Sequence, residues 1–111
     1  MKHTQVGFRV ARQVRTAERA VDQAMIEVCK LIQTSLEGRV EARLAAEVGQ
    51  SALEDIVTGL SRLATVRASV TAGHAGLATV ADDYQIGWRM EGMDELKPSV
   101  AGTADVLQLV A

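Results

Sequence analysis

Uncharged positions recur along the chain at a spacing that alternates between four and three residues. The series contains no charged residue and one polar residue, Ser35, although 23% of the chain is charged. Its members are Val10, Val14, Ala17, Val21, Ala24, Val28, Leu31, Ser35, Gly38, Ala42, Ala45, Gly49, Ala52, Ile56, Gly59, Leu63, Val66, Val70, Gly73, Leu77 and Val80. This is the spacing of the a and d positions of a heptad repeat, which line one side of a helix. The pattern predicts an all-α protein of long, coiled-coil-like helices without strands.

A turn is expected at Gly49. Ser51 and Glu54 follow it with the spacing of a capping box, in which each side chain accepts a hydrogen bond from the backbone N–H of the other residue. Gly49 would supply the left-handed residue that ends the preceding helix. We therefore expect one helix over about residues 5–48 and a second over about 51–82, folded into an antiparallel hairpin that occupies residues 1–82.

The alternative is a single unbroken helix, because the uncharged series keeps its phase through Gly49. Such a helix would be about 110 Å long at about 1.5 Å per residue. The hairpin is favoured because the members of the series on both sides of the turn are small, and small side chains let two helices come close together. In this hairpin, residue i would face roughly residue 99 − i.

The predicted apolar surface is wider than one pair of helices can cover. The flanking apolar residues are Met25, Cys29, Ile32, Leu36 and Val40 in the first helix, and Leu53, Val57, Leu60 and Ala64 in the second. A contiguous apolar surface left in water normally marks an interface. We therefore expect two hairpins to form a homodimeric four-helix bundle. The residues predicted at this interface are Met25, Ile32, Leu36, Leu53, Val57 and Leu60.

The period fades at about residue 83. Residues 83–97 are expected to form an irregular segment that folds back and caps the open end of the hairpin. Residues 98–111 are expected to be a flexible tail, although the tail ends in an apolar run, 106–110, whose role the sequence does not assign.

Composition narrows the class of protein. Hydrophobic residues make up 48% of the chain, which argues against disorder throughout. Phe, Tyr and Trp occur once each, which suits thin layers of helices better than a thick core. No run approaches the roughly 18 apolar residues of a membrane span. The single cysteine, Cys29, cannot form a disulfide within the chain, and we expect a buried thiol in a reducing cytoplasm.

Basic residues concentrate near the N-terminus, and acidic residues concentrate in 82–97. On a helical wheel four arginines share one side with Phe8, and such a stripe could hold a nucleic acid or another anionic surface. These residues are Arg9, Arg12, Arg15 and Arg19. The favoured reading is a solvated helix face paired with the acidic segment around Asp82 and Asp83, because the net charge is −2.

Candidate chemistry is sparse. Phosphotransfer domains are four-helix bundles with an exposed histidine, often followed by Lys-Gly, but no lysine follows His74 and no acidic cluster adjoins it. We expect His74 to be a surface or helix-end residue favoured by the helix dipole. The chain has no Glu-x-x-His pair of the di-iron type. We predict no catalytic residue, metal or cofactor, and a scaffold, adaptor or regulatory subunit that binds itself and an unknown protein partner.

Overall fold

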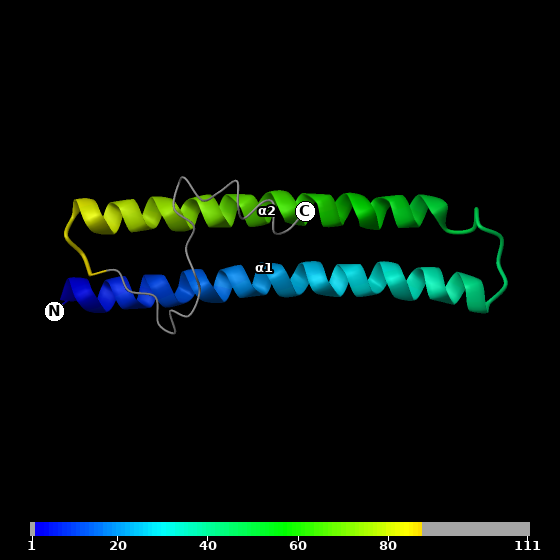
Figure 1. Cartoon of the computed structure of the whole chain (residues 1–111), viewed down its shortest axis with the longest axis horizontal. Coiled ribbons are helices and arrows are strands. Elements are labelled where there is room, and N and C mark those ends of the chain that lie inside the picture. Colours follow the sequence, from blue (N-terminus) through cyan, green and yellow to red (C-terminus); the bar gives the residue numbers. More distant parts are fainter. Residues whose placement is uncertain (1, 88–111) are drawn as a thin grey trace, which may run out of the picture.

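The chain folds into a hairpin of two long helices. The structure is a computed structural model that describes residues 2–87. Residues 88–97 of the predicted capping segment 83–97 lie outside the described residues, as does the predicted tail, 98–111. Helix α1 spans Lys2–Glu41 and helix α2 spans Gln50–Asp83. They lie side by side and run in opposite directions (Figure 1). No strand occurs within residues 2–87. The predicted all-α hairpin is confirmed, and the single continuous helix is excluded.

The described part of the hairpin has almost no core. Its buried hydrophobic residues are Ala11, which is 0% exposed, and Ala81, which is 3% exposed, and no large side chain is fully buried. This follows from the architecture, because each helix packs against only one other helix and its remaining sides are left uncovered. The contact between α1 and α2 is a single seam of small and half-buried side chains.

The seam agrees with the predicted series over part of its length. From Val10 to Val28 in α1, and at Ile56, Gly59, Leu63 and Val70 in α2, the residues of the series are half-buried. The prediction is wrong at Leu31, Ser35 and Gly38 of α1 and at Val66 of α2, which are exposed, and it is wrong again beyond Val70. The seam continues through His74, Ala78 and Ala81, whereas the predicted residues Gly73, Leu77 and Val80 are exposed.

The periodicity of an α-helix accounts for this shift. A straight helix repeats every 3.6 residues, so a heptad series rotates around it by about 20° per heptad. Leu63 and Ala81, which both lie in the seam, are separated by about five turns of 3.6 residues. Helix α2 therefore keeps the straight-helix period, and the heptad positions at its C-terminal end rotate out of the seam.

The turn begins earlier than predicted. Helix α1 ends at Glu41, not near residue 48, and residues 42–49 connect the helices. The backbone N–H of Leu44 donates to the carbonyl of Arg39 at 3.1 Å, and that of Arg43 donates to Val40 at 3.1 Å. With Arg43 at a φ of 56°, this is a Schellman motif. An arginine thus takes the left-handed position that glycine usually fills, which is why the sequence did not reveal it.

The predicted capping box at the start of α2 is absent. Gly49 has a φ of 80° and is the residue before the first turn of α2, with no side-chain cap hydrogen bond. Ser51 lies inside the helix as its second residue, so it does not occupy the cap position that a capping box requires. Gly49 is left-handed as predicted, but it begins the second helix and does not end the first.

Helix α2 ends in the same way as α1. The N–H of Ile86 donates to Ala81 at 2.8 Å, that of Gln85 donates to Asp82 at 3.2 Å, and Gln85 has a φ of 55°. This second Schellman motif turns the chain back toward α1. Gly87 then lies against Gly7 so closely that a Cβ on Gly7 would collide with the Gly87 carbonyl.

Candidate interaction surface

Two ion pairs join the helices. Arg67 Nε lies 2.7 Å from Asp22 Oδ1, and His74 Nδ1 lies 2.9 Å from Glu18 Oε2. These two pairs define the register of the hairpin. Glu18 is level with His74, whereas the predicted hairpin has Glu18 opposite about residue 81. The shift follows from the earlier turn, because a connection centred nearer residue 45 pairs each α1 residue with an earlier α2 residue.

His74 is a seam residue, which corrects the surface position expected from the sequence. It is 7% exposed, and its Nδ1 lies within hydrogen-bonding distance of the Glu18 carboxylate. The carboxylate accepts a hydrogen bond from Nδ1–H. A histidine packed in this way between two helices is not presented to a phosphodonor protein as an exposed phosphotransfer histidine would be. Sequence reasoning missed Glu18, whose one available signal was that it is the lone acid among the N-terminal arginines.

The Asp22–Arg67 pair also shows which strips of the two helices share a face. Residues three or four apart in sequence are neighbours on the surface of a helix. Asp22 begins a strip of α1 that continues through Ile26, Cys29, Gln33, Leu36 and Val40. Arg67 ends a strip of α2 that contains Leu53, Val57, Leu60 and Ala64. We call the surface formed by these two strips, from the Asp22–Arg67 pair to the turn, the turn-proximal face.

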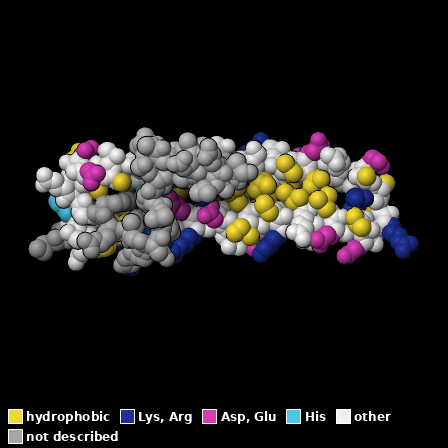
Figure 2. Space-filling model, in the orientation of Figure 1, with side chains coloured by type: hydrophobic (Ala, Val, Ile, Leu, Met, Phe, Trp, Pro, Cys, Tyr) yellow, Lys and Arg dark blue, Asp and Glu magenta, His cyan; other side chains and the backbone are white. Residues whose placement is uncertain are grey.

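The turn-proximal face is apolar and open to solvent. Ile26 is 48% exposed, Leu36 43%, Val57 47% and Val40 62%. Figure 2 shows hydrophobic side chains gathered over both helices in the half of the hairpin nearer the turn, with charged side chains around them. Large aliphatic side chains that are nearly half exposed and contiguous mark a surface that another molecule covers.

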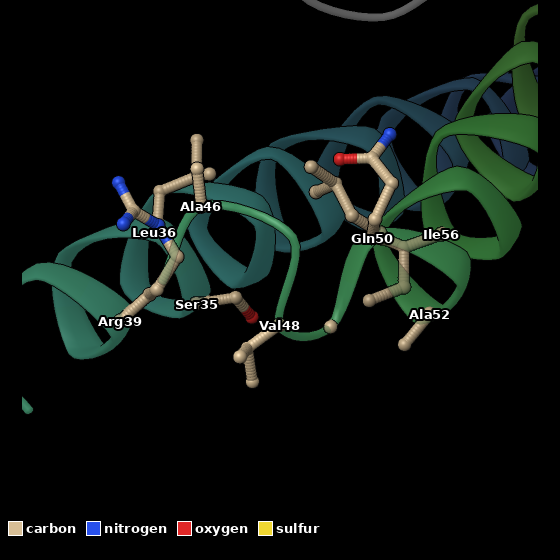
Figure 3. Close-up of a pocket in the computed structure, with 10 residues that line it drawn as sticks. Ser35, Leu36, Arg39, Ala46, Val48, Gln50, Ala52 and Ile56 are labelled. Carbon is tan, nitrogen blue, oxygen red and sulfur yellow. The ribbon is translucent and has the colours of Figure 1, made fainter. Parts of the chain in front are cut away.

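A groove of about 290 Å³ lies between the helices where this face meets the turn. Figure 3 shows Leu36 and Arg39 of α1, Val48 of the connection and Ile56 of α2 around it. The Arg39 guanidinium donates to the carbonyl of Leu44 at 3.0 Å, so this charge serves the turn. Apart from Ser35 and Gln50, the rest of the groove is lined by small and aliphatic residues, which suits an aliphatic side chain of a partner helix better than a polar ligand.

The residues predicted at an oligomer interface divide into two groups. Met25, Ile32, Leu53 and Leu60 are half-buried, while Leu36 and Val57 are exposed. The first group thus lies between α1 and α2 or at the edge of the seam, and the second faces solvent. Cys29 corrects the expected buried thiol, because it is exposed in the middle of the turn-proximal face.

The predicted arginine stripe is interrupted. Arg9, Arg12 and Arg19 are exposed, but Arg15 is only 7% exposed. Arg15 follows the buried Ala11 by one helical turn, so its stem lies on the covered side of α1. The stripe therefore does not present four adjacent guanidinium groups. In both side-chain pairs between the described helices, the acid lies on α1 and the base on α2.

The described residues contain neither a metal-binding cluster nor a membrane-spanning helix. Within 2–87, no cluster of three or more His, Cys, Asp or Glu side chains is placed to hold a metal ion. Neither of the two described helices combines the length and the apolar character needed to cross a membrane. The turn-proximal face is thus the most developed candidate surface of the described hairpin.

Comparison of the chain with protein-family models, with curated proteins and with solved structures found no match.

Proposed function

We propose that the protein is a non-enzymatic interaction protein, a scaffold, adaptor or regulatory subunit, whose working surface is the turn-proximal face. The observation that carries this proposal is the exposure of Leu36, Val57 and Val40 on a hairpin in which no large described side chain is fully buried. Burying apolar surface contributes about 25 cal/mol per Å². A hairpin that leaves this much aliphatic surface in water gains stability when a second molecule covers it.

The proposal includes self-association, because two such hairpins would bury both faces in a four-helix arrangement. It also includes contact with a different protein through the surface that remains exposed in the dimer. The single cysteine fits a reducing compartment, and we infer a cytoplasmic protein on that ground. The burial of Arg15 argues against binding of an anionic surface, because it interrupts the arginine stripe that such binding would use.

The proposal is tested by introducing a charge into the face. Leu36→Glu and Val57→Glu alter residues of nearly equal exposure on α1 and α2. We expect the wild-type chain to have twice the monomer molar mass by light scattering, and each variant to have the mass of a monomer, because a glutamate buried in an apolar contact lacks a partner. Helical circular dichroism should be retained, since both positions are exposed within the hairpin.

Leu77→Glu is the matched control. Leu77 is also exposed, at 41%, but it lies in the half of α2 away from the turn. We expect this variant to keep the wild-type mass. Equal masses for the wild type and the two face variants at every concentration would reject the turn-proximal face as the interaction surface. An equal loss of mass in Leu77→Glu would also reject it, since the association would not be specific to the face.

A further inference from the structure

Two charges of opposite sign, Lys30 and Glu37, lie at the edge of the turn-proximal face on either side of Gln33. Lys30 and Glu37 are separated by about two turns of α1, so they project from the same side of the helix. Both are exposed. Gln33 lies within the α1 strip of the face. Lys30 and Glu37 lie three residues before it and four residues after it, and they carry opposite charges.

Within one chain these two charges have other partners. Lys30 Nζ lies 3.2 Å from Glu27 Oε1, and the Gln33 amide donates to Glu37 Oε1 at 2.8 Å. Lys30 and Glu37 themselves are about 10 Å apart along the helix at 1.5 Å per residue. Lys30 and Glu37 therefore do not pair with each other within one chain, but each can pair with an opposite charge of a second molecule.

Two copies can lay their faces together in two ways. If the turns lie at the same end, α1 of one copy covers α2 of the other. The register set by the two ion pairs then places Glu37 level with about residues 52–55, at about 1.5 Å per residue. Glu37 would approach the exposed acid Glu54 of the other copy, and like charges across an interface oppose binding.

If the turns lie at opposite ends, α1 covers α1 of the other copy in the antiparallel sense. Lys30 of each copy then approaches Glu37 of the other, and Val57 lies level with Gln33. The apolar strips overlap over most of their length. Charge complementarity thus favours this arrangement over the one with the turns at the same end.

The area meets the lower limit for such a dimer. Residues 22–41 correspond to about 30 Å of helix, and two helices side by side are about 20 Å wide, so the face covers about 600 Å². Two copies would bury about 1,200 Å² in total, which is the lower end of the range of specific, stable interfaces, about 1,200–2,000 Å².

We propose that the turn-proximal face is covered by a second copy of this chain, with the turns at opposite ends and a two-fold axis passing near Gln33. This inference rests on the proposed function, and it names the partner and its orientation. Lys30 and Glu37 set the orientation, while the apolar strips supply the binding free energy.

Charge reversal tests the orientation. We expect Lys30→Glu and Glu37→Lys each to weaken dimerisation several-fold in sedimentation equilibrium, because each places like charges together at two symmetry-related sites. The double variant Lys30→Glu/Glu37→Lys should recover most of the wild-type affinity. A tighter dimer for Glu37→Lys alone would overturn the proposal in favour of the same-end arrangement, and no recovery in the double variant would also overturn it.

A distance measurement supplies an independent test. In a Cys29→Ser background, Gln33→Cys and Gln23→Cys would each carry one nitroxide label on an exposed residue of α1. The proposed dimer brings the labels at 33 close together and holds those at 23 about 30 Å apart along the helix axis. Equal label separations at the two positions would overturn the orientation.

The experiments distinguish an error in the interaction surface from an error in the dimer orientation. If Leu36→Glu abolishes the dimer but the charge and label experiments contradict the orientation, the interaction surface stands and this inference is wrong. If Leu36→Glu leaves the molar mass unchanged, the proposed function is wrong as well.

Discussion

Glycines inside the two helices differ in what surrounds them. A Cβ on Gly73, or on Gly38 in α1, would meet nothing within 4 Å. A Cβ on Gly7 would collide with the Gly87 carbonyl oxygen and would also approach the Ile86 side chain. At Gly38 and Gly73 the missing side chain only lowers helix stability. At Gly7 it allows the backbone of Gly87 to come close to α1.

This difference predicts opposite effects of alanine. Gly73→Ala should stabilise the protein by about 0.5–1 kcal/mol, because alanine restricts the unfolded chain and favours the helix. Gly7→Ala should lose this gain and destabilise the protein, since the segment that follows α2 would have to move away from α1. Chemical denaturation followed by circular dichroism measures both effects. A similar gain in stability for both variants would show that the contact between Gly7 and Gly87 does not matter.

At the scale of the elements, both helices end in Schellman motifs whose left-handed residues are not glycine. Arg43 and Gln85 have φ values of 56° and 55°. A left-handed conformation costs an L-residue about 1–2 kcal/mol, and the hydrogen bonds of the motif offset this cost. The motifs determine where the connection begins and where the chain returns to α1. The register of the hairpin, and with it the pairing of Glu18 with His74, follows from their positions.

The partly buried Glu18–His74 pair should contribute more to helix pairing than the exposed Asp22–Arg67 pair. Glu18→Leu removes the carboxylate from a histidine that is 7% exposed, and we expect a loss of about 1–3 kcal/mol. Glu18→Leu/His74→Leu should recover much of this loss, because an apolar pair replaces two desolvated polar groups.

Asp22→Leu is the control for this comparison, because the Asp22 and Arg67 side chains are about half exposed and such pairs contribute about 0–1 kcal/mol. Urea unfolding of the wild type and the three variants measures these differences. A larger loss for Asp22→Leu than for Glu18→Leu would contradict the ranking.

At the scale of the whole molecule, the described hairpin is a single layer of two helices. The hairpin is about as long as its 40-residue helix α1, roughly 60 Å at 1.5 Å per residue, and it is one layer of helices thick (Figure 1). Two helices in one layer cannot enclose a core, so the apolar surface that they do not bury against each other remains outside. Association with a second hairpin would add the second layer that most helical domains build within one chain.

The stability of the folded chain should consequently depend on its concentration. Binding to the folded state stabilises it by mass action, so the midpoint of thermal unfolding should rise as the protein concentration rises. Leu36→Glu should unfold at a lower temperature with no such dependence. Calorimetry over a hundredfold concentration range measures both. A midpoint that stays constant for the wild type would mean that the hairpin is stable alone.

The sequence by itself determined the class of fold. The uncharged series from Val10 to Val80 predicts two helices packed along one side, because helical periodicity is a local property repeated in every turn. The apolar flank at Leu36 and Val57 was also predicted as a surface for another molecule, and its exposure in the hairpin agrees with that expectation. That these residues contact a second copy remains a prediction.

Only the tertiary structure decided which residues face the second helix. His74 enters the seam, Arg15 is covered and Cys29 is exposed, and each of these differs from its expected place. The reason is that a rotation of about 20° per heptad, or a turn that begins a few residues earlier, moves a side chain from one face to the next without changing the local period. Helical propensity and spacing therefore fix the elements, whereas the register between them depends on contacts between residues far apart in the chain.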